Sequence, residues 1–278
     1  MSRIRVITKE NIARYIKPNF FTRKTVHSDY CIIGYLDILG STERIKSEDD
    51  SDESLNSVFN LYSATSSLIK VIKHAGDISN IRVRIFSDNI ILLYPFKDRD
   101  LHRLKQKKLI EEISRSLPLV VALSAIFQIV AFAGLKWCIR GGITDGRVFN
   151  NGELIWGKGL VRAYDIENTE AKYPRIVIDE ELINEFGINE DIAVREWCGV
   201  ALDEDGKYYV DFVNIMGRLS ESPEVGNAIY EMFEKNFAEL ESDNEKVLDK
   251  YRWFVKTYAN SMNNPELLEN YPNLKFNL

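Results

Sequence analysis

The most restrictive feature of the sequence is a run of 19 residues, Leu117 to Leu135, that contains no charged side chain. A helix that is apolar on all sides must be buried in protein or in lipid, and this run is just long enough to span a membrane. Pro118 opens the run, Ser124 and Gln128 interrupt it, and its small residues suit close packing on a sheet. We therefore predict a buried core helix and no membrane partner. A helical scaffold or membrane-associated protein is the alternative, which purification without detergent tests.

Composition and charge indicate an ordinary globular chain. Apolar residues make up 45% and charged residues 28%, and 36 Lys and Arg against 42 Asp and Glu give a net charge of −6. An acidic chain argues against nonspecific nucleic-acid binding, so we expect no nucleic-acid partner. The three cysteines, Cys31, Cys138 and Cys198, are far apart and odd in number, and the N-terminus lacks the apolar region of a secretory signal. Both features predict reduced thiols and a cytoplasmic protein.

The hydrophobic periodicity predicts an α/β (α+β) domain over residues 29–215, with helical extensions over 1–28 and 216–278. Cys31–Leu39 is a continuous apolar run, which is typical of a central strand covered on both faces. Turn residues and changes of period set the other expected elements. They are a helix over Leu55–Ile72, a hairpin of Ile81–Phe86 and Ile90–Tyr94, a strand over Trp137–Val148 with another near Leu154, a helix over Gly157–Glu167, a strand over Arg175–Ile178, a helix over Glu180–Phe186, a hairpin of Ala193–Ala201 and Tyr208–Val213, and a helix from Ser222 to Met262.

Two aspartates stand out against their apolar surroundings. Asp37 lies inside the first strand, and an isolated carboxylate there costs several kcal/mol unless a cation or dense hydrogen bonding satisfies it. Asp88 lies at the tip of the first hairpin, where on its own it is most simply an ordinary turn residue. If adjacent strands bring the two together, they form a hard oxygen site suited to Mg²⁺ or Mn²⁺ and to phosphate chemistry.

Four short segments, in order, resemble the class III nucleotidyl cyclases. The segment Tyr35–Thr42 is similar to their first metal-binding strand, and Phe86-Ser87-Asp88 to the hairpin that supplies the second metal-binding aspartate. Arg140–Gly146 resembles their Gly-Ile-x-x-Gly strand. Trp156-Gly157, followed by Ala163 and Glu167, resembles the glycine-led helix beside it. Together the segments span about two-thirds of the chain.

The resemblance implies a ferredoxin-like catalytic domain whose sites form at a head-to-tail homodimer interface. It implies that Asp37, Asp88 and the backbone of Ile38 hold two divalent ions, Mg²⁺ or Mn²⁺. The backbone around residues 38–42 would cradle the phosphates of a nucleoside triphosphate, as amides at a strand-to-helix turn can. The residues of that cradle are Ile38, Leu39, Gly40, Ser41 and Thr42.

The sequence departs from the family pattern where purine cyclases read the base and steady the transition state. Arg84 stands in place of a base-reading lysine, and Leu154 in place of the acidic base reader. Val161 and Asp165 stand where Asn and Arg are expected. A catalytically degenerate domain that only senses nucleotides is therefore an alternative. A helix-surface contact with Asp165 is the simpler explanation of Arg162, and replacement of the missing arginine is the alternative.

The sequence keeps both metal-binding aspartates, has a changed base-reading pair and ends in a long helical tail. In these features it resembles the bacterial pyrimidine cyclases of Pycsar antiphage systems. That resemblance implies a product that activates a separate effector protein. Arg84 offers only donors, which match O4 and O2 of uracil better than the amino group of cytosine. We therefore favour UTP as substrate and cyclic UMP as product. CTP is the main alternative, and a purine is another because guanine also presents acceptors to arginine.

Overall fold

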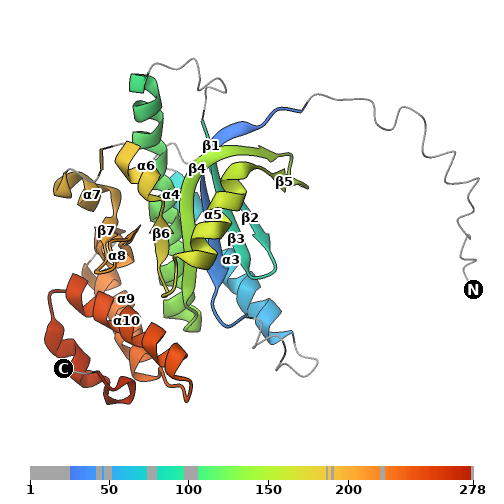
Figure 1. Ribbon diagram of the computed structural model, residues 1–278. Coiled ribbons are helices and arrows are strands. Elements are labelled where there is room, and N and C mark those ends of the chain that lie inside the picture. The colour runs from blue at the N-terminus through green and yellow to red at the C-terminus, as the bar shows by residue number, and fades with distance from the viewer. Residues whose placement is uncertain are drawn as a thin grey trace, which may run out of the picture.

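The computed structural model describes residues 26–41, 46, 52–73, 80–96, 106–185, 187–188, 191–219 and 223–276. The helical extension expected over 1–28 therefore lies almost wholly outside the described residues. The predicted α/β class is confirmed, because a mixed sheet is covered by helices on both faces (Figure 1). The strands are β1 (Asp29–Ile38), β2 (Arg82–Phe86), β3 (Asn89–Pro95), β4 (Ile139–Asn150), β5 (Ile155–Trp156), β6 (Ile176–Ile178), β7 (Val200–Leu202) and β8 (Tyr208–Val210).

The sheet has the order β2-β3-β1-β4-β6-β8-β7, and β5 pairs with β4 beside this path. Only the β4–β6 pair is parallel within the described sheet. Because β1 has a partner on each side along its length, its ends are fixed in register with both neighbours. The helices are α3 (Glu53–Lys73), α4 (Gln106–Leu135), α5 (Lys158–Thr169), α6 (Glu180–Glu185), α7 (Ile192–Cys198), α8 (Phe212–Leu219), α9 (Pro223–Ala238) and α10 (Glu245–Ser261), followed by 3₁₀ turns at Pro265–Asn270 and Pro272–Leu274.

The residues of β1 alternate between two hydrophobic clusters. Ile32, Leu36 and Ile38 belong to the large core that includes α4, whereas Ile33 packs in a smaller cluster with Ala163 of α5. Successive side chains of a strand point to opposite faces. The odd-numbered positions of β1 therefore face α5, and Asp37 is one of them.

The charge-free run lies in α4 and is the core helix that the sequence predicts. Leu117, Val120, Phe127 and Phe132 are fully buried, and α4 packs against β1, β3 and β4 as well as α3, α8 and α9. The segment Ile110–Leu135 is long and apolar enough to cross a membrane, but a buried core helix meets the same criteria, and 67% of its most apolar window is inside the protein. Burial against the sheet satisfies its apolar surface.

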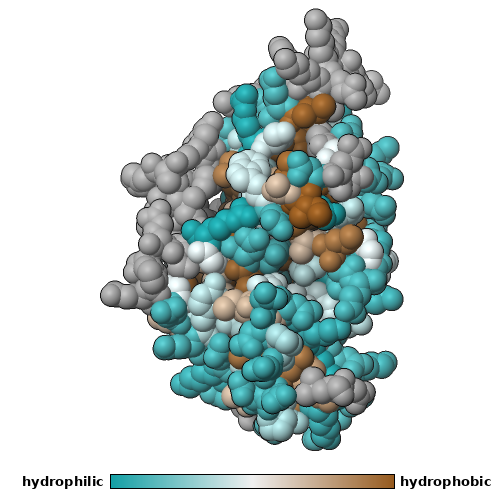
Figure 2. Space-filling view, turned by 90° about the vertical axis from the view of Figure 1, so that its left-hand side faces the viewer, coloured by the Kyte–Doolittle hydropathy of each residue, from teal (hydrophilic) through white to brown (hydrophobic). Residues whose placement is uncertain are grey.

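The structure corrects the strand predicted over 193–198, which is the helix α7. Asp191 caps this helix, because its side chain accepts the N–H groups of Ala193 and Val194, and Gly199 ends it in a left-handed conformation at φ 72°. The hydrophobic pattern of this segment predicted a strand wrongly, because several of its apolar residues face solvent. Trp197, for example, is 63% exposed. Figure 2 faces the side of the molecule that carries α7 and shows hydrophobic side chains gathered in its upper half.

The region predicted to be helical from Ser222 to Met262 consists of two helices, α9 and α10. A break follows Ala238, and Asn244 starts α10 by accepting the N–H of Lys246 on its side chain. Asn at this position competes with helix continuation by bonding the local backbone. The break lets α10 turn and pack beside the β7–β8 hairpin.

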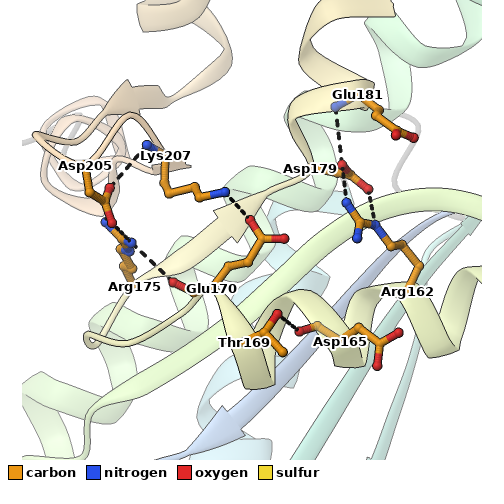
Figure 3. A network of polar contacts seen from close by, with 9 residues as sticks. All are labelled: Arg162, Asp165, Thr169, Glu170, Arg175, Asp179, Glu181, Asp205 and Lys207. Atoms are coloured by element: carbon orange, nitrogen blue, oxygen red, sulfur yellow. Dashed lines mark hydrogen bonds and ion pairs between the residues drawn. The ribbon is translucent and has the colours of Figure 1, made fainter.

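A buried arginine ties α10 to this hairpin. The side chain of Arg175 is fully buried and forms an ion pair with Asp203. It forms a second ion pair, at 2.5 Å, with Asp205 (Figure 3). Trp253 of α10 donates its indole N–H to Asp203 at 2.9 Å and stacks on Tyr173 with ring centroids 5.4 Å apart. A buried arginine without its partners would be very unfavourable, so this cluster holds the C-terminal helices against the sheet.

We expect Arg175→Ala to lower the free energy of unfolding by about 3–5 kcal/mol, because it leaves Asp203 without its cation in a largely buried place. Lys256→Ala is the matched control: Lys256 pairs with the exposed Glu204 at 2.8 Å, and its loss should change stability by less than about 1 kcal/mol. Urea denaturation followed by circular dichroism measures both. Equal stability of the two variants would show that the buried pairs do not hold this region.

Candidate active site

Asp37 lies near the end of β1, directly between Asn89 on β3 and Arg140 on β4. Arg140 Nε lies 3.2 Å from Asp37 Oδ2 and 2.6 Å from Oε1 of Glu167, a buried residue of α5. One guanidinium therefore bridges a carboxylate on the sheet and a carboxylate on the helix that covers it. The cation that the sequence required for a buried Asp37 is supplied, in part, by the neighbouring strand.

Electrostatically, this site carries more negative than positive charge. Burial raises the pKa of Asp37 above its usual value; Arg140 opposes the shift, and the charge of Asp88 adds to it. Burial likewise raises the pKa of Glu167, Arg140 lowers it, and both aspartates raise it. The carboxylates are thus close enough to repel one another, and ionising all of them favours the arrival of a further cation.

Asp88 occupies the turn between β2 and β3, and the structure brings it to the end of β1. The Asp88 carbonyl accepts the Ile38 N–H at 3.2 Å. Its carboxylate accepts the hydroxyl of the buried Ser41 and, at 3.1 Å, the side-chain amide of Asn89. These donors orient the carboxylate while leaving it partly accessible.

The loop after β1 offers fewer free amides than the sequence suggested for a phosphate cradle. The N–H of Ile38 is used by Asp88, and that of Leu39 donates to the Cys138 carbonyl at 2.9 Å. Gly40 turns the chain at φ 77°, a conformation that favours glycine. Among the residues described here, the amides of Gly40 and Ser41 remain for a ligand, and Thr42 lies outside the described residues.

The two predicted base readers lie near one hairpin. Arg84 is exposed on the edge strand β2, and its guanidinium reaches the backbone at Gly152. A Cβ atom added to Gly152 would lie 3.5 Å from Arg84 Nη2. Gly152 belongs to the turn that leads to Leu154, which is 51% exposed. In the same turn Asn150 accepts the Gly152 N–H, and its buried amide nitrogen has no partner among the described residues. Both polar groups here present donors.

Arg162 forms an ion pair that sequence reasoning did not foresee (Figure 3). Its Nε and Nη2 atoms lie 2.9 and 3.0 Å from the two carboxylate oxygens of Asp179, which also accepts the Thr144 hydroxyl at 2.8 Å. Burial opposes ionisation of Asp179, but these hydrogen bonds hold its pKa below the usual value. The partner of Arg162 is thus Asp179 and not Asp165. A catalytic role for Arg162 would compete with this pair.

Arg140 and Glu167 are the site residues that the sequence analysis quoted in motifs but did not assign to the site. Their signal was present: Arg140 is a charge at the mostly buried start of β4, and Glu167 stands at a core-facing position of an amphipathic helix. Their contact joins residues far apart in the chain, so only the register of β1 with β4 reveals it.

The donors at this site fit a divalent cation. Asp37 and Asp88 supply carboxylate oxygens beside the carbonyl of Ile38, and hard cations prefer such ligands. The described part of the chain has no group of three or more His, Cys, Asp or Glu arranged to hold a metal by themselves. Protein oxygens alone would thus leave coordination positions for water or for phosphate oxygens, as Mg²⁺ sites commonly do.

No protein-family model and no curated protein matches this sequence. Solved structures give distant similarities. The adenylyl cyclase CyaB from P. aeruginosa is 17% identical, with a TM-score of 0.39 over 66% of this chain and 93% of that one. A class III adenylyl cyclase-like ATP-binding protein from Pseudomonas aeruginosa is 14% identical, with a TM-score of 0.43 over 75% of this chain and 43% of its own. The guanylyl cyclase domain of the RhoGC fusion protein from Blastocladiella emersonii is 12% identical, with a TM-score of 0.40 over 66% and 95% of the two chains. At these values the functional assignment rests on the site residues themselves.

We expect Asp37→Asn to melt within about 2 °C of the wild type, or above it, in EDTA at pH 7.5. Because burial raises the pKa of Asp37, its ionised form weakens the folded state. Wild-type stability relative to the variant should therefore fall as pH rises through the raised pKa of Asp37. Calorimetric scans from about pH 3.5, below the pKa of an unfolded-state aspartate, to pH 8 measure this, with the exposed Asp165→Asn as control. A drop of more than about 5 °C in Asp37→Asn would make the Asp37–Arg140 pair a structural ion pair.

Proposed function

We propose that the protein is a nucleotidyl cyclase that converts a nucleoside triphosphate into a 3′,5′-cyclic nucleotide and pyrophosphate. UTP is the favoured substrate and cyclic UMP the favoured product. The observation that carries this proposal is the pair Asp37 and Asp88, held together at the end of β1 with an unneutralised excess of negative charge. Oxygen ligands and negative charge are what a divalent ion bound to a triphosphate requires.

In the proposed reaction the ribose 3′-oxygen forms a bond to the α-phosphorus while the bond from that phosphorus to the bridging oxygen of the β-phosphate breaks. The hydroxyl proton is lost to solvent, and pyrophosphate leaves. Asp37, Asp88 and the Ile38 carbonyl would hold two Mg²⁺ or Mn²⁺ ions, which lower the pKa of the hydroxyl and neutralise the triphosphate.

The remaining residues of the site orient these ligands. Arg140 fixes the carboxylate of Asp37 and is itself fixed by Glu167, while Ser41 and Asn89 fix that of Asp88. The amides of Gly40 and Ser41 face the phosphates, with Thr42 expected to continue the cradle. We assign Arg162 the stabilisation of the transition state, a role that requires its guanidinium to leave Asp179.

In this proposal the protein selects the base through hydrogen-bond donors, because the expected base-reading residues offer no acceptor. Arg84 and the amide nitrogen of Asn150 both donate, and the apolar Leu154 cannot accept the amino proton of adenine or cytosine. Leaving such an amino group unpaired costs about 1–3 kcal/mol, which is roughly five- to a hundredfold in specificity. Uracil presents the acceptor O4 at the position where cytosine presents an amino group, so we propose UTP.

A homodimer is part of this proposal, since the family site takes groups from two subunits. The exposed face of β5 and α5 carries large apolar side chains that a second copy would cover: Leu154, Trp156, Val161 and Tyr164, with Trp156 74% exposed. We also propose a cytoplasmic location, a role in antiphage signalling, and a separate effector that the cyclic nucleotide activates.

Incubation of the full chain with each of the four ribonucleoside triphosphates and Mn²⁺, followed by mass spectrometry, should yield a cyclic nucleotide. Asp37→Asn and Asp88→Asn should each lower kcat by about two to three orders of magnitude, because each removes a charge that the metal needs. Asp249→Asn, on the exposed side of α10, is the control. Tight nucleotide binding without any product would instead favour a non-catalytic nucleotide sensor, for which Val161 and Asp165 in place of Asn and Arg already argue.

Arg84→Ala should lower kcat/KM for UTP about five- to a hundredfold and flatten the preference among nucleotides. Arg82→Ala is the matched control, because Arg82 is exposed on the same face of the same strand two residues away. Steady-state kinetics with UTP, CTP, ATP and GTP measure the ranking. A wild type that prefers CTP, ATP or GTP, or an unchanged ranking in Arg84→Ala, would show that Arg84 is not the base reader.

Trp156→Glu should convert a dimer into a monomer and reduce turnover at least tenfold, because it places a charge in the proposed interface. Trp197→Glu on α7 is the control, since Trp197 is 63% exposed on another helix outside the β5–α5 face. Sedimentation velocity and the cyclase assay give the two readouts. A fully active wild-type monomer would contradict the dimer.

A further inference from the structure

A cavity of about 360 Å³ lies beside the candidate active site, between the loop after β1 and the helix α10. Among the lining residues that the structure describes, two are lysines and none carries a carboxylate. This is unusual in a chain with a net charge of −6. The lining residues are Leu39, Gly40, Lys136, Cys138, Pro174, Asn244, Val247, Lys250 and Tyr251.

The cavity is lined in part by the loop that follows β1, the strand that carries Asp37. Leu39 and Gly40 follow Asp37 by two and three residues, and the Leu39 N–H donates to the carbonyl of Cys138, which also lines the cavity. Lys250 lines the same cavity as Leu39 and Gly40, which directly follow the strand that carries Asp37. A ligand in the cavity would therefore lie next to the ions that Asp37 and Asp88 are proposed to hold.

Lys250 is held at this place by the buried cluster around Arg175. Trp253 is three residues further along α10, so it shares a helix face with Lys250, and it is fixed by Tyr173 and Asp203. Pro174, between Tyr173 and Arg175, lines the cavity itself. The same packing that attaches the C-terminal helices thus sets the position of the Lys250 ammonium.

The two lysines differ in what they already bind. Lys136 is paired with Glu239, whereas Lys250 has no carboxylate within ion-pair distance among the described residues. An ammonium group with three donors is a common ligand for phosphate oxygens. A small polyanion is the ligand class that matches a carboxylate-free cavity with a free ammonium beside a metal site.

We propose that Lys250, assisted by Lys136, binds the β- and γ-phosphates of the substrate and the pyrophosphate product in this cavity. This inference rests on the proposed cyclase function and deepens it, because it makes the C-terminal helix α10 part of the active site. The loop after β1 has two of its amides already in use, and the lysines supply what that loop lacks.

Binding of inorganic pyrophosphate to the full-length protein in Mg²⁺, measured by isothermal titration calorimetry, tests the inference without requiring turnover. Lys250→Ala should weaken pyrophosphate binding by roughly ten- to a hundredfold, and Lys250→Arg should restore most of it. Lys256→Ala, six residues further along α10 and outside the cavity, should bind as the wild type does. Equal melting temperatures exclude unfolding as the cause.

The outcomes separate this inference from the proposed function. If Lys250→Ala loses pyrophosphate binding but the wild type forms no cyclic nucleotide, the phosphate site stands and the cyclase assignment fails. If the wild type is an active cyclase and Lys250→Ala changes neither the pyrophosphate Kd nor the KM for the triphosphate, the inference is overturned. Absence of pyrophosphate binding by the wild type would overturn it as well.

Discussion

The structure depends on how the carboxylate of Asp37 is tolerated in the middle of a sheet. Asp37 lies on a central strand and points to the face of the sheet that α5 covers, so its carboxylate is largely shielded from solvent. Arg140 neutralises it from β4, and Glu167 holds Arg140 from α5. Asp88 adds a further negative charge, and this excess of negative charge is the basis of the proposal that a divalent cation binds here.

Much of the fold could be predicted from the sequence because most elements bury one regular stripe of apolar residues. The first strand, the β2–β3 hairpin, and the helices α3, α4 and α5 were expected within a few residues of where they lie. Periodicity failed where apolar residues face solvent, as Trp197 does on α7, and where Asn244 breaks a long apolar pattern between α9 and α10. The predicted boundaries of the catalytic domain and of its extensions stay a prediction.

The candidate site was less predictable, because its contacts join residues that the sequence places far apart. That Asp37 and Asp88 lie close together could be expected, because Asp88 is at the tip of a predicted hairpin. The pairs Arg140–Glu167 and Arg162–Asp179 could not, because they depend on strand register and on where α5 crosses the sheet. The position of Lys250 beside the metal aspartates depends in turn on a buried arginine in another element. None of these contacts leaves a local pattern in the sequence.

Equilibrium binding of Mn²⁺, followed by the electron paramagnetic resonance signal of the free ion, tests the central claim most directly. In the presence of a non-hydrolysable triphosphate analogue, the wild type should bind two ions per subunit, and Asp37→Asn or Asp88→Asn should lose that binding while remaining folded. Unchanged Mn²⁺ binding in both variants would contradict the claim that these two aspartates form the metal site.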